Sequence, residues 1–186
     1  MKISADLTKD VATIGVYHQT DIACIGLWNS DKLSWVNPNI ENTSLTNFIE
    51  NGDPKTDGQI IATKTGSDGN FKVILHLNEN LSTEESSLIY KQEKGISLSV
   101  NGQVCIGSPE WAGGSESSAI ERNKVDVLLV PEGEYIVDAY SLLITDESGG
   151  PKYIQFVFCI FTKEKYVSTN SEIRSTNRAL SLQYTK

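Results

Sequence analysis

The sequence predicts an all-β fold, a single antiparallel β-sandwich of about eight to ten short strands with one or two short helical turns. Three observations lead to this prediction. Apolar and polar residues alternate with period two in many short segments, turn residues separate the segments, and no strand pattern alternates with a long helical pattern. A chain of 186 residues, 39% of them hydrophobic, is long enough to bury one core.

We expect one domain, a sandwich over residues 1–166, followed by a polar C-terminal extension over residues 167–186. No internal repeat or linker divides the chain. The extension begins with STNSEIRSTN, and it either stays loose or docks through the final RALSLQYTK as a last strand or turn.

The first strands are expected at residues 13–20, 22–28 and 58–65. The next segment, NFKVILHLN at 70–78, alternates most clearly, with Phe71 and Leu75 among the residues of its apolar face. The dipeptide Asp68-Gly69 before it is interpreted as a hairpin turn.

Short helical turns are expected at two places. Ser82 with Glu85 three residues later predicts a capping box at the start of one helical turn. A second short helix is expected at residues 45–52, ended by Gly52.

Two further hairpins are predicted. In GISLSVNGQVCIG, at 95–107, Asn101-Gly102 suits the type I′ turn of a hairpin. In LLVPEGEYIVDAY, at 128–140, Pro131 and Gly133 suit a turn that reverses one core strand into its neighbour.

In the two strands around this last turn, the alternation predicts which residues face the core and which face water. Tyr135, Val137 and Ala139 are expected to point inward, while Asp126 and Asp138 are expected to face water. The last strand, at 152–161, is apolar on both faces, which favours a central place in a sheet or a covered junction.

Net charge and cysteine content indicate which classes of partner and which cellular compartment to expect. A net charge of −8 disfavours nucleic acid and anionic membranes as partners, and it suits either simple solubility or a basic protein partner. No signal peptide is recognisable, and the longest apolar run is too short to span a bilayer. Cys24, Cys105 and Cys159 each lie in an apolar stretch without metal-ligand spacing, which indicates buried reduced thiols in a cytoplasmic protein.

No catalytic constellation emerges. The two histidines, His18 and His76, lie on expected strands and are interpreted as core or rim residues with a hydrogen bond, although a Cys–His pair involving His18 stays open. The Asp/Gly-rich turns at 52–58 and 65–70 do not match the EF-hand spacing for calcium. We therefore expect a protein without enzymatic activity, metal or cofactor.

Three segments together resemble a known family. They are IGVYHQTDIACIG (14–26), DGQIIATKTGSDGNFKVILHLNEN (57–80), and the block from 95 to 140 that ends in a Pro-x-Gly-x-Tyr strand entry. Their succession is similar to the competence-protein-J type of small bacterial β-sandwich protein, over roughly residues 11–145. The chain departs from this type in a longer stretch after Trp28 and in the residues beyond 145.

That resemblance implies an inhibitor of a DNA-entry nuclease, an immunity-like role that an acidic protein suits. We therefore expect a non-enzymatic binding protein that inhibits or neutralises a basic protein partner, such as a nuclease or a toxin. The implied contact is an acidic loop face beside an aromatic anchor, and the best candidate is Glu110 with Trp111 and Glu116. The alternative for Trp111 is that it closes one end of the sandwich.

Two other functions stay open. One is a calcium- or carbohydrate-binding module that uses Trp28, Trp35 or Trp111. The other is a structural or assembly protein that self-associates through its sheet edges.

Overall fold

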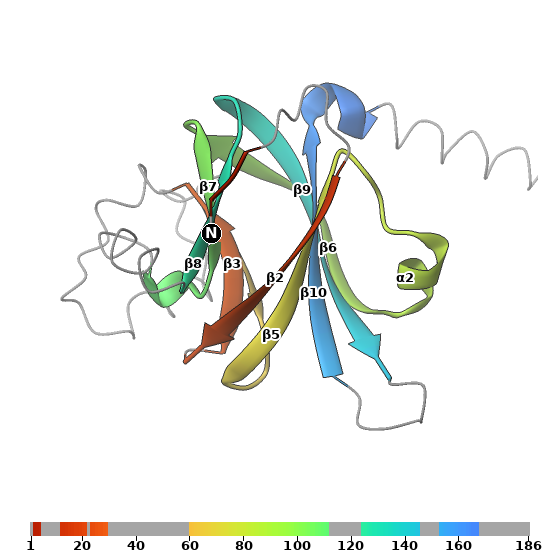
Figure 1. The fold of residues 1–186 in the computed structure, drawn as a ribbon. Helices are drawn as coiled ribbons and strands as arrows, with labels where there is room; N and C mark the ends of the chain where they lie inside the picture. Colours follow the sequence, from red (N-terminus) through yellow and green to blue (C-terminus); the bar gives the residue numbers. More distant parts are fainter. Residues whose placement is uncertain are drawn as a thin grey trace, which may run out of the picture.

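The computed structural model describes residues 2–4, 12–21, 23–29, 60–111, 124–145 and 153–167, which form two five-stranded sheets packed face to face. Figure 1 shows the two layers edge-on. The predicted all-β sandwich is confirmed.

The first sheet has the strand order β1 (Lys2–Ser4), β8 (Val125–Leu129), β7 (Gln103–Gly107), β3 (Cys24–Trp28) and β4 (Ile60–Lys64). The second sheet has the order β2 (Ala12–Thr20), β5 (Gly69–Leu77), β10 (Tyr153–Thr162), β9 (Gly133–Ile144) and β6 (Ile89–Val100). The strand pairs are antiparallel except for β1 with β8 and β5 with β10, which are parallel. The sandwich is thus antiparallel in most of its pairs, and the sequence patterns did not predict β1.

Alternation along each strand builds the core. Val73, Leu75 and Leu77 of β5 are all fully buried between the sheets, as are Phe156 and Phe158 of β10. Tyr135, Val137 and Ala139 of β9 point into the same core, as their spacing predicted. Burial of this apolar face is the main contribution that holds the two layers together.

The outer face of the second sheet is largely covered too. Tyr140, Val157, Cys159 and Phe161 form a second apolar cluster there, which Leu81, Leu88 and Tyr166 cover from the segment around helix α2 (Thr83–Ser87) and from the helical turn at 163–167. The expectation that the last strand is central and covered on both faces is therefore confirmed. The capping box is also confirmed, because Ser82 and Glu85 make both of its hydrogen bonds.

The prediction that Asp138 faces water is wrong. Asp138 does lie on the outer face of the second sheet, but only 3% of it is exposed. Its Oδ1 accepts hydrogen bonds from the Gly95 backbone N–H (2.8 Å) and the Tyr166 hydroxyl (3.2 Å), and its Oδ2 accepts one from the Tyr140 hydroxyl (3.2 Å). Burial of the carboxylate is tolerated because these donors replace water.

The three predicted hairpins are wrong in their pairing. Each turn carries the chain from one sheet to the other instead of joining neighbouring strands. The turn at 101–102 joins β6 to β7, which lie in opposite sheets. The same holds for the turn at 130–132, between β8 and β9, and for the turn at 65–68, between β4 and β5.

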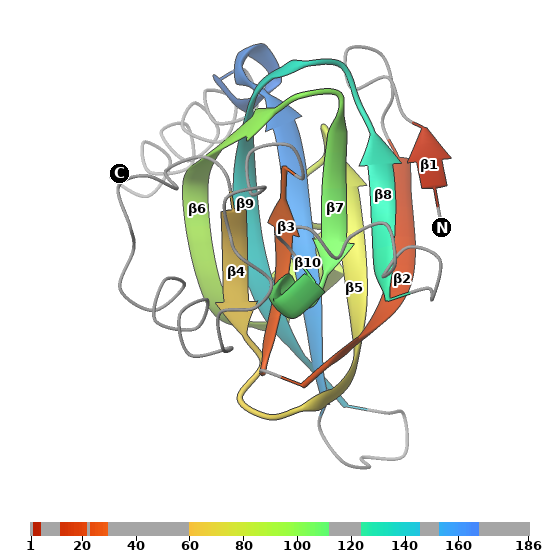
Figure 2. The same cartoon turned by 90° about the vertical axis from the view of Figure 1, so that its left-hand side faces the viewer.

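The result is two folded ribbons, each a long antiparallel pair bent over from one sheet into the other. In the first ribbon, β2 pairs with β5 in the second sheet, and their continuations β3 and β4 pair in the first sheet. In the second ribbon, β6 pairs with β9, and β7 pairs with β8. Figure 2 shows both chains of the second ribbon crossing at the top of the molecule and those of the first ribbon crossing at the bottom.

Local chemistry explains the bend of the second ribbon. Gly102 has φ +83°, which glycine adopts readily, whereas Asn101 does not adopt the positive φ that a type I′ turn requires. The Val130 N–H donates to the Gly102 carbonyl (3.2 Å), so the two bends are joined to each other. The Tyr135 hydroxyl donates to the carbonyl of Pro131 (2.8 Å) and holds the second bend against the strand that follows it.

Some predictions fall outside the described residues: the helix at 45–52 and the C-terminal extension after residue 167. All three cysteines are buried and carry thiols, as predicted. Among the described helices, none is long and apolar enough to cross a membrane.

Candidate partner-binding site

The bend of the first folded ribbon and the short 3-10 turn η3 (Pro109–Trp111) lie at the same end of the sandwich. Gly26 of β3 allows η3 to pack closely, since a Cβ there would lie 3.3 Å from Pro109 Cγ and 2.6 Å from the Ile61 carbonyl oxygen. The two crossings of the ribbon are joined by hydrogen bonds from Thr65 N–H to the Ala23 carbonyl (2.8 Å) and from Ala23 N–H to Asp68 Oδ1 (3.0 Å). We call this region the acidic end, after Asp21, Asp68 and Glu110.

Asp21 and Asp68 act on the carboxyl group of Glu110. Burial raises the pKa of Glu110, and the negative charges of Asp21 and Asp68 raise it further. Interactions with Ser108 and with the Asp21 backbone oppose this rise without cancelling it. The ionised Glu110 is therefore held in an unfavourable field, which a cation placed nearby would relieve.

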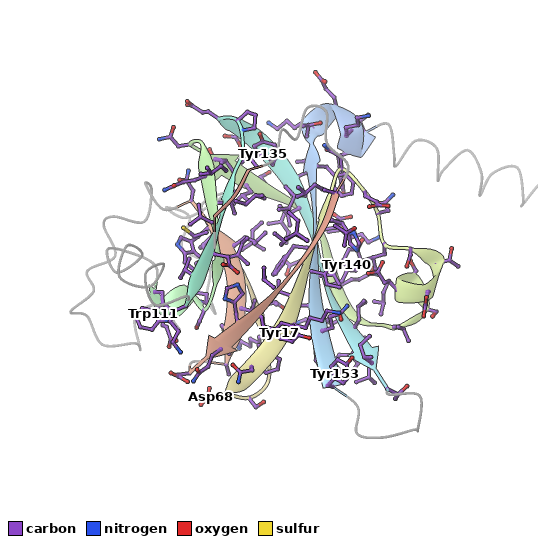
Figure 3. The ribbon with its side chains drawn as sticks, viewed as in Figure 1. Tyr17, Asp68, Trp111, Tyr135, Tyr140 and Tyr153 are labelled. Atoms are coloured by element: carbon purple, nitrogen blue, oxygen red, sulfur yellow. The ribbon has the colours of Figure 1, made fainter. Side chains whose placement is uncertain are left out.

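Trp111 is half-buried beside this cluster. Its ring packs against a small apolar group on the outer face of the first sheet, which includes Trp28, Cys105 and Val127. Figure 3 shows Trp111 and Asp68 at the same end of the molecule. Trp111 thus contributes to packing and also offers part of its ring to the surface.

The predicted site of Glu110, Trp111 and Glu116 stays a prediction. The structure places Glu110 and Trp111 next to each other in η3, and Glu116 lies outside the described residues. Sequence reasoning did not include Asp21 and Asp68, which the bend of the first ribbon brings to Glu110. Their only signal was that each lies in a turn, and the sequence does not show which turns meet.

A buried polar layer supports the acidic end from below. The Ser108 hydroxyl donates to Thr20 Oγ1 (2.9 Å), which in turn accepts from the Cys24 backbone N–H (3.2 Å). His18 Nε2 lies 3.4 Å from Asp126 Oδ2, a contact that links the two sheets. Burial raises the pKa of Asp126, but favourable interactions, with His18 first among them, outweigh burial and lower the pKa overall.

The pair of His18 and Asp126 does not form an accessible catalytic site. The His18 side chain is only 1% exposed, so a dissolved substrate cannot reach its nitrogens. His76 is likewise buried, and it is held by Thr13 and Glu85 through its two nitrogens (2.9 and 3.0 Å). Both histidine side chains are thus buried and lie against an acidic side chain.

The structure bears on the residues named for a calcium- or carbohydrate-binding module. Trp28 is completely buried and cannot serve as a platform for a ligand, while Trp35 lies outside the described residues. In the Asp/Gly-rich turn at 65–70, Asp68 accepts a hydrogen bond from the Ala23 N–H. In the part of the chain that the structure describes, no three His, Cys, Asp or Glu residues are grouped to hold a metal ion.

Comparison with known proteins finds similar solved structures but no match by sequence. No protein-family model matches the chain, and no curated protein matches it significantly. Two solved structures are similar. One is described as crocagin biosynthetic gene J, with a TM-score of 0.50 and 16% identity, covering 83% of this chain and 97% of that one.

The other solved structure is ComJ from Bacillus subtilis, described as an inhibitor of the DNA-degrading activity of NucA. Its TM-score is 0.50 at 11% identity, and the match covers 82% of this chain and 98% of that one. At these identities the likeness establishes a shared fold. The resemblance to the competence-protein-J type that the sequence motifs suggested is thereby confirmed at the level of the fold.

Proposed function

We propose that this chain is a non-enzymatic inhibitor that binds a basic protein, a nuclease, and covers the surface on which the nuclease holds DNA phosphates. The observation that carries the proposal is the acidic end, where Glu110 is packed near Asp21 and Asp68 on a fold shared with ComJ. Basic side chains that bind phosphate carry the charge opposite to that of these carboxylates.

Electrostatics gives the mechanism of the proposed inhibition. In the unbound protein, Glu110 bears the cost of burial and of two like charges. Lysine or arginine side chains of a nuclease would pair with the carboxylates and remove that cost, so the site is arranged for a cationic partner. The half-buried ring of Trp111 adds an aromatic contact beside the charges, as is common at interface centres.

The direct test mixes the purified protein with a purified DNA-degrading nuclease from the same organism and follows DNA cleavage. We expect stoichiometric inhibition that weakens as salt is added, because the attraction is between charges. Undiminished cleavage at excess protein would refute the inhibitor function.

Charge reversal tests the site separately. Glu110→Lys should weaken inhibition about tenfold or more, since it replaces attraction with repulsion at the interface. Glu132→Lys is the matched control, because Glu132 is an exposed acid at the opposite end, in the bend between β8 and β9. Equal inhibition by both variants would remove the acidic end as the contact and leave the inhibitor function standing. Glu116→Lys extends the test to the rest of the predicted site.

A further inference from the structure

The second sheet divides at one end, between two of its central strands. β5 and β10 are register partners only from Val73–Phe156 to Leu77–Ile160. Before these pairs, β5 continues along β2 as far as Gly69, while β10 continues along β9 from Tyr153. Figure 1 shows the two strands spreading apart toward the bottom of the view. We call the space between them the fork.

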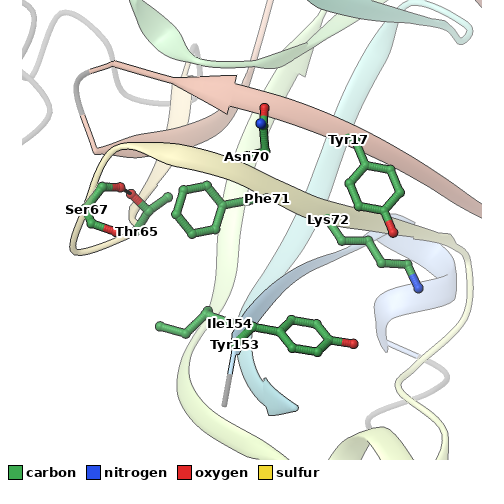
Figure 4. A pocket seen from close by; sticks show the side chains of 8 residues that line it. All are labelled: Tyr17, Thr65, Ser67, Asn70, Phe71, Lys72, Tyr153 and Ile154. Carbon is green, nitrogen blue, oxygen red and sulfur yellow. Dashed lines mark hydrogen bonds between the residues drawn. The ribbon is translucent and has the colours of Figure 1, made fainter. Parts of the chain in front are cut away.

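The fork is a hollow of about 430 Å³, within the size range of small-ligand pockets. Residues from both strands and from their neighbours surround it (Figure 4): Tyr17, Thr65, Ser67, Asn70, Phe71, Lys72, Tyr153 and Ile154. They divide into a cationic and phenolic end, an apolar floor, and a neutral polar end.

The cationic end consists of one lysine and two tyrosines. Tyr17 and Lys72 are directly opposite each other on β2 and β5, and Tyr153 faces them from β10. Tyr17 is 72% exposed and Tyr153 is 49% exposed, unusually open for such large rings. Among the described residues, no carboxylate lies within ion-pair distance of Lys72.

The floor and the opposite end of the fork are held rigidly. Phe71 packs edge-on against Phe156, with ring centroids 5.5 Å apart, and Ile154 packs against the same core. At the polar end, the Thr65 hydroxyl donates to the Ser67 carbonyl (2.6 Å) and fixes the turn. The hollow therefore has a preformed apolar base, which lowers the entropic cost of binding.

We propose that the fork binds a ligand in which an apolar, planar ring carries an anionic group. The ring lies on Phe71 and Ile154 between the two tyrosines, and the anion pairs with the Lys72 ammonium and accepts hydrogen bonds from the phenols. The proposal does not rest on the proposed inhibitor function: the turn at 65–68 borders both sites, but the fork offers a cation where the acidic end offers carboxylates. The same chemistry occurs in a free aromatic carboxylic acid and in a protein segment with an acidic residue beside an aromatic one.

The test uses the whole protein, labelled with ¹⁵N, and three probes: 1-naphthylacetate, its neutral amide, and the blocked dipeptide acetyl-Phe-Glu-amide. Backbone amide shifts of residues 65–72 and 153–154 should change saturably with naphthylacetate, with a Kd on the order of 1 mM for a ligand of this size. The neutral amide should bind at least about fivefold more weakly, because it cannot pair with Lys72. Tighter binding of the dipeptide than of the free acid would identify a protein segment as the source, and the reverse would identify a small molecule.

Two pairs of variants complete the test. Lys72→Gln and Tyr153→Leu should each raise the Kd for naphthylacetate at least about fivefold. Lys91→Gln and Tyr90→Leu are the matched controls, since both residues are exposed on β6, away from the fork, and they should leave the Kd unchanged. The proposal is overturned if the shifts do not saturate, or if Lys72→Gln binds as tightly as the unmodified protein.

Discussion

Oε1 of Glu85 lies 3.0 Å from Nε2 of His76, while Oε2 of the same carboxylate accepts the backbone N–H of Ser82 at 2.9 Å. One side chain thus completes the capping box of α2 and also holds a buried histidine of β5. Nδ1 of that histidine lies 2.9 Å from the Thr13 hydroxyl of β2. This chain of contacts fastens α2 to the outer face of the second sheet.

Glu85→Ala should therefore lower the free energy of unfolding by about 1–2 kcal/mol, since it removes the acceptor of the Ser82 N–H in the capping box and a partner of His76. Burial raises the pKa of Glu85, but hydrogen bonds from Ser82 and His76 more than compensate and lower the pKa below 4.5 overall. The stabilisation is thus fully present above pH 4.5 and is lost as the pH falls through the folded-state pKa. Urea unfolding at pH 7 and pH 3 measures this. Glu84→Ala is the control, and an equal loss in both variants would contradict the prediction.

Removal of the charge of Glu110 should stabilise the unbound protein. Burial, with the charges of Asp21 and Asp68, raises the pKa of this carboxyl above 4.5, so the ionised form costs folding free energy at pH 7. The cost disappears as the pH falls below the folded-state pKa toward 4.5. Glu110→Gln should thus unfold at higher urea than the unmodified protein at pH 7 and at the same urea near pH 4. Glu132→Gln should show no such pH-dependent gain, and a loss of stability in Glu110→Gln at pH 7 would refute the account.

Asp138 should be among the most sensitive positions for stability. Asp138→Ala leaves the Gly95 N–H and two tyrosine hydroxyls without their buried acceptor, and it should cost about 3 kcal/mol or more. Tyr166→Phe removes only one of these donors and should cost about 1 kcal/mol. Denaturant unfolding of the two variants tests the order, and a cost below about 1 kcal/mol for Asp138→Ala would contradict it.

The cysteines should be unreactive in the folded protein. Burial raises the pKa of the Cys159 thiol, and the nearby Asp138 carboxylate raises it further, so the reactive thiolate is scarce. Cys24 and Cys105 are also buried, at 4% and 0% exposure. Ellman's reagent at pH 8 should therefore detect almost no thiol in the native state and all three in guanidinium chloride. Rapid native reaction of any one of them would show that its surroundings open readily.

Much of this fold follows from local patterns. Alternation located the strands and the inward faces of residues such as Val73 and Val137, and the pair Ser82 and Glu85 marked the start of α2 correctly. The pairing could not be predicted in the same way. A period of two shows which residues share a face, and Asn101-Gly102 shows where the chain turns, but neither shows which sheet receives the next strand.

The candidate site illustrates the same limit. Glu110 and Trp111 were recognisable as an acid beside an aromatic ring in a polar loop. Asp21 and Asp68 join them only because the first folded ribbon bends at that end. The burial of Asp138 could not be predicted from the sequence either. Gly95 and Tyr166 donate hydrogen bonds to it, and both are distant from it in sequence.

Because each folded ribbon contributes strands to both sheets, neither sheet can unfold independently of the other. Separating the layers requires straightening both ribbons, and peeling one strand from an edge disturbs a partner that continues into the opposite layer. Local losses therefore spread through the whole β-structure, and loss of structure should be cooperative, with both layers disappearing in one step.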